Sequence, residues 1–189
     1  MGTEEQHGQM DALTALLTRR SVRAFLEDPV SEETVVMLLR AAMQAPSAGD
    51  ARPWDFVVIR SKEVLQGIGD VNPYAKFAAH ASVGILVCGN LERERFPGLW
   101  IQDTSAAMEN LLIAAHALGL GAVWTAVAPF DERIDVVRAL CSLPKTVIPL
   151  GCALVGYPMY LPKPQDRFDA SRIHQDHWED TRLSGGPLN

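Results

Sequence analysis

The sequence is poor in the features that mark several large classes of protein. It has three cysteines in 189 residues and no CxxC pair, so we expect buried, inert thiols rather than a disulfide framework. Its formal net charge of −6 argues against a general nucleic-acid binder, which needs many lysines and arginines to neutralise phosphates. No apolar run approaches the roughly 20 residues of a membrane-spanning helix, and residues 1–10 do not resemble a signal peptide. We therefore expect a soluble, cytoplasmic protein that binds neither nucleic acid nor a membrane.

The composition that remains is that of an ordinary folded domain. Hydrophobic residues make up 48% of the chain and charged residues 21%, which is far from the composition of disordered proteins. A chain of this length can bury a core without disulfides or metals, and no internal repeat divides it. We predict a single domain over residues 1–189, with flexible or arm-like ends at 1–10 and 175–189.

Hydrophobic periodicity and turn residues predict an irregular alternation of helices and strands. Ser31 is expected to cap a helix that stops before Pro46, and Asp131 is expected to cap another that runs through Leu140. Ser61 and Asn72-Pro73 both have the composition of helix starts. The other expected helices are 13–18 and 101–118, and the expected strands are 54–59, 82–88, 122–127 and 147–155.

The clearest local anomaly is a cluster of arginines directly after the first expected helix. The segment 19–23 reads Arg-Arg-Ser-Val-Arg in a chain that is acidic overall. Guanidinium groups form forked, charge-assisted hydrogen bonds with phosphate oxygens, and a serine hydroxyl adds a further donor. Taken alone, the cluster is more typical of a solvated helix end, where arginine complements the helix dipole.

Two glycine-containing segments also suggest a ligand, although each alone is better explained as a turn. Segment 45–54 is rich in small residues and leads into a strand, so its backbone could approach a flat ligand closely. Segment 118–124 has a Gly-x-Gly pair but has Trp124 where a dinucleotide-binding fingerprint needs a third glycine. Its order is helix then strand, the reverse of that fingerprint.

Five segments together resemble the nitroreductase family in order, spacing and flanking pattern. They are 19–25, 45–54, 100–112, 118–124 and 156–158, and the resemblance that they define extends over most of the chain. The resemblance implies an α+β fold with three α/β/α layers around a mixed, mostly antiparallel sheet, in an intertwined homodimer. It also implies FMN at each of two interface sites, a small-molecule substrate, and NADH or NADPH as the electron donor. We therefore expect a flavin oxidoreductase that reduces nitroaromatics, quinones or similar acceptors.

The resemblance assigns roles to particular residues. Arg19, Arg20 and Ser21 are expected to hold the FMN phosphate and ribityl chain, and Arg23 to reach the N1/O2 edge of the ring, where a cation stabilises the reduced flavin. A backbone N–H near Ala126 and Val127 is expected at flavin N5, and Lys163 and Arg167 are expected at the phosphate. The full expected set is Arg19, Arg20, Ser21, Arg23, Pro46, Ser47, Ala48, Asp50, Arg52, Trp124, Thr125, Ala126, Val127, Lys163 and Arg167.

Several positions depart from the family pattern. Asp50 and Arg52 stand where many relatives have Asn and Gln, and a carboxylate near the reduced flavin would oppose its negative charge. The spacing between Lys163 and Arg167 makes Arg167 the better phosphate ligand of the two.

Other classes of function remain as alternatives. His174 and His177 form an HxxH pair without a third ligand at supporting spacing, so no metal site is expected. Within the family, the chain could instead be a specialised metabolite dehydrogenase, a dehalogenase or a flavin-fragmenting enzyme, although the short 93–98 region offers no large lid. Outside it, the alternatives are an FMN-binding module without turnover and a structural protein that binds no flavin.

Overall fold

A four-stranded antiparallel sheet forms the centre of the molecule. The computed structural model of the chain describes residues 10–178, and in it the strands are β1 (Trp54–Ile59), β2 (Val83–Asn90), β3 (Gly121–Ala126) and β4 (Val147–Gly156). Their order across the sheet is β1-β2-β4-β3, and each neighbouring pair is antiparallel. Parallel pairing within the described residues is limited to a single bridge between Ser21 and Ala122. The strands therefore confirm the predicted α+β class.

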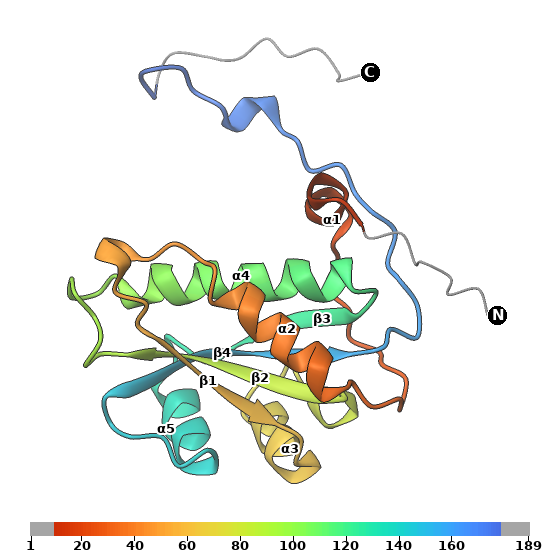
Figure 1. Cartoon of the computed structure of the whole chain (residues 1–189), viewed down its shortest axis with the longest axis vertical. Coiled ribbons are helices and arrows are strands. Elements are labelled where there is room, and N and C mark those ends of the chain that lie inside the picture. Colours follow the sequence, from red (N-terminus) through yellow and green to blue (C-terminus); the bar gives the residue numbers. More distant parts are fainter. Residues whose placement is uncertain (1–9, 179–189) are drawn as a thin grey trace, which may run out of the picture.

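Helices cover both faces of this sheet, as Figure 1 shows. α2 (Glu32–Ala42) and α4 (Trp100–Ala117) pack together on one face, and α3 (Lys62–Asp70) and α5 (Asp131–Leu140) pack on the other. The central strands β2 and β4 are buried on both faces, which explains their continuous apolar runs. The short helix α1 (Ala12–Thr18) packs beside α4. The three-layer arrangement predicted from the sequence is confirmed.

The helix boundaries follow the expected capping residues with two exceptions. Ser31 and Ser61 accept the N–H groups of Thr34 and Val64 and so cap α2 and α3 as predicted. The predicted cap at Asp131 is wrong, because Asp131 is the first residue of α5 and the capping position belongs to Phe130.

The predicted helix start at Asn72-Pro73 is also wrong. The Asn72 Oδ1 accepts the N–H of Tyr74 at 3.1 Å, and its Nδ2 donates to the Ala126 carbonyl at 3.4 Å. This side chain therefore stabilises a local turn in competition with a helix. The segment is a turn that leads to a short 3-10 helix, Ala78–His80.

The buried thiols agree with the sequence-based interpretation. Cys88 and Cys152 lie inside the sheet and are free, and Cys141 is partly buried. Burial raises the pKa of Cys88 to about 12 and also raises that of Cys152, so neither is a ready nucleophile at neutral pH.

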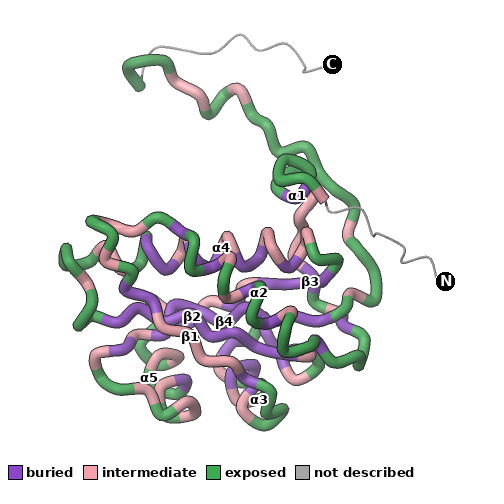
Figure 2. Tube along the Cα trace, viewed as in Figure 1, coloured by how far each residue is buried: buried purple, intermediate pink, exposed green. Residues whose placement is uncertain are grey.

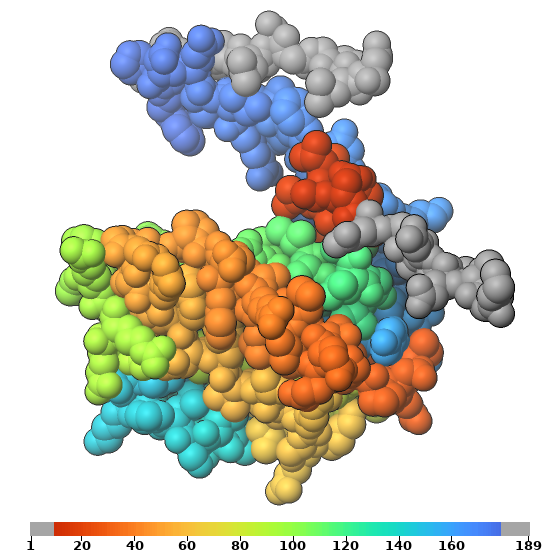
Figure 3. Space-filling view, in the orientation of Figure 1, coloured from red at the N-terminus to blue at the C-terminus, as the bar shows by residue number. Residues whose placement is uncertain are grey.

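Two parts of the described chain carry apolar side chains that the core does not cover. In Figure 2, α1 and the segment after β4 are largely exposed, whereas the sheet is buried. Leu13, Leu16 and Leu17 on α1 are 69%, 53% and 73% exposed, and Tyr160 and Phe168 are 66% exposed each. Figure 3 shows that both parts project from the body of the molecule. Among the described residues, no helix combines the length and the apolar composition that a membrane crossing needs. The predicted arms at 1–10 and 175–189 lie mostly outside the described residues.

Candidate functional site

The arginine segment 19–23 is fixed against the first residues of β3. The Val22 N–H donates to the Ala122 carbonyl at 3.0 Å, and the Val22 side chain is buried. A Cβ on Gly121 would lie 2.7 Å from Val22 Cγ1, so only glycine permits this close approach. The pairing holds the backbone of Ser21 and Arg23 beside the sheet.

The three arginines of this segment differ in their surroundings. The Arg19 Nε lies 3.2 Å from the Glu109 carboxylate of α4, so its charge is partly neutralised. The Arg20 Nε is buried and has no hydrogen-bond partner among the described residues. Arg23 is exposed. A buried guanidinium N–H without a partner is costly, and a bound anion would satisfy it.

A histidine joins the end of α1 to α4. The His116 Nε2 lies 2.8 Å from the Thr18 hydroxyl, one residue before Arg19. Burial lowers the pKa of His116, and the nearby Arg19 charge lowers it further. The Thr18 and Arg19 contacts together position the arginine segment at the C-terminal half of α4.

The loop 46–52 is held at the opposite end of α4. The buried Asp103, in the first turn of that helix, accepts the Ala48 N–H at 2.9 Å. Within the loop, the Ser47 hydroxyl accepts the Arg52 N–H at 2.9 Å. The backbone is left-handed at Gly49, Asp50 and Arg52, which is unusual for the two non-glycine residues and is found more often at functional loops.

Asp50 and Arg52 form an ion pair inside this loop. The Arg52 Nε and Nη2 donate to the two Asp50 oxygens at 2.7 and 2.8 Å. This bidentate contact lowers the pKa of Asp50 and raises that of Arg52. The two charges that depart from the family pattern therefore neutralise each other.

The predicted site residues do not all come together within one chain. Asp103, which holds the loop 46–52, and His116, which holds the end of α1, are 13 positions apart on α4, or about 20 Å at the usual helical rise. Figure 1 shows the loop and the arginine segment at opposite ends of that helix. These two anchor points are too far apart for one flavin ring to contact both.

A cleft of about 290 Å³ lies beside the arginine segment, at the end of β3. Arg23 and the predicted Trp124, Thr125 and Ala126 line it. Its other walls come from residues that sequence reasoning missed: Asn72, Tyr74, Phe77, Val123, Phe130 and Arg133. Arg133 donates to the Ala126 carbonyl at 3.2 Å, and its guanidinium lies 4.1 Å from the Phe130 ring centre. Apolar walls with a few convergent polar groups are typical of a small-molecule site.

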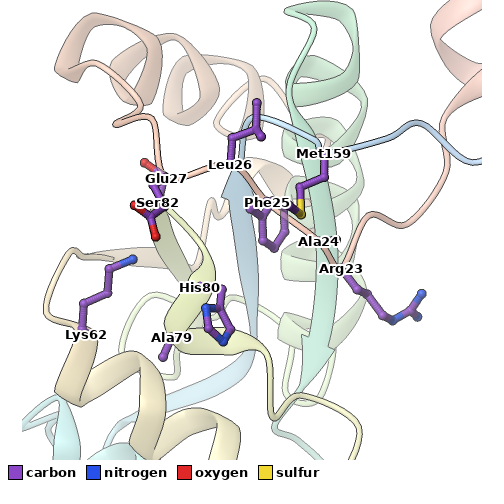
Figure 4. A pocket seen from close by; sticks show the side chains of 10 residues that line it. All are labelled: Arg23, Ala24, Phe25, Leu26, Glu27, Lys62, Ala79, His80, Ser82 and Met159. Atoms are coloured by element: carbon purple, nitrogen blue, oxygen red, sulfur yellow. The ribbon is translucent and has the colours of Figure 1, made fainter.

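A larger cavity of about 900 Å³ adjoins the cleft and shares Arg23 with it. Figure 4 shows Lys62, His80 and Glu27 among its lining side chains, with Arg23 extending away from the others. The Lys62 ammonium donates to the Ala81 carbonyl at 2.7 Å. The cleft therefore opens beside a second space large enough for another small molecule.

Comparison with known proteins shows the family to which the chain belongs. The model of the nitroreductase family matches residues 16–84 and 70–157, which together make up most of the chain. The chain belongs to the nitroreductase family.

Individual relatives match nearly end to end. A protein of Methanothermobacter thermautotrophicus, provisionally named an NADH dehydrogenase/NAD(P)H nitroreductase, is 46% identical over 170 residues, covering 90% of this chain and 89% of that protein. An FMN-dependent nitroreductase structure from Clostridium difficile has a TM-score of 0.81 at 26% identity, covering 88% of this chain and 99% of that chain. A structure from Desulfovibrio desulfuricans, provisionally named a nitroreductase and solved in complex with FMN, has a TM-score of 0.76 at 29% identity, covering 88% and 97%.

The backbone N–H expected at flavin N5 already has a hydrogen-bond partner within the chain. The Val127 N–H, expected to be free for a flavin, donates to the Leu150 carbonyl at 3.1 Å, and so does the N–H of Ala128. The next residue, Pro129, has no N–H. The loop after β3 therefore offers no uncommitted donor at Val127 or Ala128.

The expected phosphate ligands Lys163 and Arg167 lie on the exposed segment after β4. Its start is paired with the residues directly after the arginine segment, because the Leu26 N–H donates to the Tyr157 carbonyl and the Met159 N–H to the Ala24 carbonyl. Beyond it, within residues 10–178, no hydrogen bond or ion pair joins Lys163 or Arg167 to residues 19–23. Both side chains are exposed.

Proposed function

We propose that two copies of this chain bind FMN between them and catalyse NAD(P)H-dependent reduction of electrophilic acceptors such as nitroaromatics or quinones. When bound, FMN would supply the redox chemistry, accepting a hydride at N5 and passing electrons to the acceptor. The observation that carries the proposal is the buried Arg20 Nε, which has no hydrogen-bond partner within residues 10–178 and belongs to the same segment as Arg23, a residue that lines the cleft. The protein groups bind and orient the reactants and exclude water.

The phosphate end of FMN fits the arginine segment. Arg20 has a buried donor ready for an anion, and Ser21 adds a hydroxyl on the same fixed backbone. Arg19 is oriented by Glu109. Lys163 and Arg167 would add two further cations if the segment after β4 folds toward the phosphate.

The flavin ring fits the cleft at the end of β3. Arg23 would place a cation at the edge where negative charge develops on reduction, which stabilises the reduced ring. Trp124, Thr125 and Ala126 would form the wall beside it. The Val127 N–H could contact N5 only by sharing or leaving its bond with Leu150.

The other face of the ring would come from the partner subunit. The loop 46–52, with Pro46, Ser47, Ala48, Asp50 and Arg52, is anchored at Asp103, about 20 Å along α4 from the His116 that holds the end of α1, and we assign it to the site of a second copy. The exposed leucines of α1 supply an apolar surface for such a dimer. Among the strands that the structure describes, β1 pairs with β2 alone, and its other edge would accept a segment of the partner.

The departures at Asp50 and Arg52 are compatible with this site. An isolated carboxylate would disfavour an anionic reduced flavin, but the bidentate bond from Arg52 neutralises it. The loop therefore presents a neutral pair rather than a negative charge.

A mixed dimer tests both the cofactor and its place at the interface. One copy carries Arg20→Met and the other carries Asp103→Ala, which removes the anchor of loop 46–52. If each site combines Arg20 of one copy with the loop of the other, one intact site forms and the dimer retains one tightly bound FMN, measured by absorbance. If each site lies within one copy, both sites are damaged and the mixed dimer retains none.

The same preparation separates the alternatives for turnover. Fast NAD(P)H oxidation that requires a nitroaromatic or quinone supports the general reductase. Bound flavin that NAD(P)H does not reduce indicates a binding module, and reduction without transfer to these acceptors indicates a specialised enzyme of the family. Purified protein without flavin absorbance, before and after added FMN, contradicts the proposal.

A further inference from the structure

The short connection between β2 and α4 packs directly on loop 46–52. The Arg95 Nη1 donates to the Gly49 carbonyl at 3.0 Å. A Cβ on Gly49 would lie 2.8 Å from Arg95 Cδ and 2.9 Å from Phe96 Cε2, so the absent side chain leaves room for both residues. Arg95 and Phe96 are therefore part of the surface that surrounds this loop.

Arg95 differs from the other arginines of this surface in its charge balance. Arg52 is paired with Asp50, and Arg93 donates to Asp55 at 2.8 Å. Within residues 10–178, Arg95 has no carboxylate partner and contacts only a neutral carbonyl and the face of Phe96, whose ring centre is 5.9 Å from its guanidinium carbon. The remaining N–H groups of Arg95 can bind an anion.

Phe96 adds an exposed aromatic surface beside this cation. Its side chain is 48% exposed, although a buried position would be the usual one for phenylalanine. A flat ring stacked on Phe96 would place an attached anionic group near the Arg95 guanidinium.

We propose that Arg95 and Phe96 form a subsite for a planar ring that carries an anionic group. The inference rests on the proposed function, in which loop 46–52 reaches the flavin of the partner subunit and brings Arg95 and Phe96 to the mouth of that site. Two reactants have this chemistry: an aromatic carboxylate acceptor, and the nicotinamide nucleotide with its bases and phosphates. The subsite selects the ligand by charge and takes no part in hydride transfer.

Two acceptors of similar shape and different charge distinguish the subsite from general effects on turnover. The holoenzyme is assayed with 4-nitrobenzoate and with neutral 4-nitrobenzamide, in wild type, Arg95→Gln and Arg93→Gln. If the acceptor is the ligand, Arg95→Gln raises the KM for 4-nitrobenzoate about tenfold, the usual effect of losing a charged hydrogen bond, and leaves 4-nitrobenzamide unchanged. Arg93→Gln, whose arginine already pairs with Asp55, changes neither.

The donor is varied in a second arm of the same experiment. If the nucleotide is the ligand, Arg95→Gln raises the KM for NADH, NADPH or both. The KM values for 4-nitrobenzoate and 4-nitrobenzamide then stay as they are in wild type. An unchanged KM for both acceptors and both donors overturns the subsite. Turnover of 4-nitrobenzamide by wild type reports on the proposed reductase activity separately, so failure of that activity is recognised on its own.

Binding without turnover provides an independent measurement. Benzoate and benzamide are titrated calorimetrically into oxidised wild-type and variant holoenzyme, and AMP is titrated in the same way as a probe for the nucleotide. Arg95→Gln is expected to weaken benzoate or AMP about tenfold while benzamide is unaffected. Phe96→Ala is expected to lower the affinity for the same ligand through lost stacking, whereas Phe96→Tyr, which keeps an aromatic ring, is expected to bind it as wild type does. If wild type, Arg95→Gln and Phe96→Ala bind benzoate with equal affinity and also bind AMP with equal affinity, the proposal is contradicted.

Discussion

The two ends of α4 hold the two parts of the proposed flavin site, and they differ in whether their charged side chains have partners. At the C-terminal half, the segment 19–23 has a buried arginine donor, the Arg20 Nε, without a hydrogen-bond partner within residues 10–178. At the N-terminal end, Asp103 accepts a backbone N–H and Asp50 pairs with Arg52, so the loop is internally satisfied. A region with an unsatisfied charge is prepared for a ligand of opposite charge, whereas a satisfied region can approach the uncharged part of a ligand. The difference suggests one end for the phosphate and the other for the ring.

The largest expected effect is on FMN affinity and comes from removing the guanidinium of Arg20. Arg20→Met should weaken FMN binding about 100-fold, because a charged hydrogen bond to phosphate is lost. The flavin-free protein should keep or gain stability, because the variant removes a buried donor without a partner. FMN titration and urea unfolding of the flavin-free protein measure the two effects. Equal loss of both would show that Arg20 is structural.

Removing the anchor of loop 46–52 should, unlike Arg20→Met, destabilise the flavin-free protein. Asp103→Ala leaves the Ala48 N–H without its acceptor and should lower the unfolding free energy by about 2 kcal/mol. Asp103→Asn keeps an oxygen acceptor and serves as the control, with a smaller loss. Urea unfolding of the flavin-free protein provides the comparison, and an Asp103→Ala variant as stable as wild type would refute the anchoring role.

Removing one charge of the Asp50–Arg52 ion pair should change the midpoint potential of bound FMN more than the stability of the fold. Asp50→Asn leaves the Arg52 charge uncompensated, so the midpoint potential of bound FMN should rise by an amount on the order of tens of millivolts. Arg52→Gln should lower the potential, and the double variant should return close to wild type. Spectroelectrochemical titration measures these values. A potential that is insensitive to both single variants would place the pair away from the ring.

The smallest expected effect is the pH dependence of the α1 contact. The folded state lowers the pKa of His116, so below the ordinary histidine pKa of about 6.5 the unfolded chain binds more protons. The His116 contribution to stability is therefore complete above about pH 6.5 and is lost as the pH falls toward the lowered folded pKa. Solvent screening of this partly buried ring keeps the effect small. Urea unfolding between pH 5 and 8 should show a shallower acid slope for His116→Gln, and parallel slopes would contradict this assignment.

Local patterns predicted most of the secondary structure but not the neighbours of the site. Ser31 and Ser61 mark helix starts because their hydroxyls accept nearby N–H groups, which is a short-range effect. The same argument failed at Asn72, whose side chain is engaged by Ala126 from a distant strand. The contacts of Glu109 with Arg19 and of Asn72 with Ala126 could not be predicted from the sequence, because the partners are far apart along the chain.

The sequence by itself determined the elements, the family resemblance and the residues to test, because periodicity, capping and motif order are properties of the chain. Tertiary structure alone decided which of these residues can share a site. Asp103, which anchors loop 46–52, and His116, which holds the end of α1, lie 13 positions apart on α4, and we therefore propose that one chain supplies two half-sites rather than one whole site. Packing also decided which arginines are already paired with a carboxylate, as with Arg52 and Arg93, and which have no carboxylate partner within residues 10–178, as with Arg20 and Arg95. These pairings depend on distances between side chains, and no pattern along the chain specifies them.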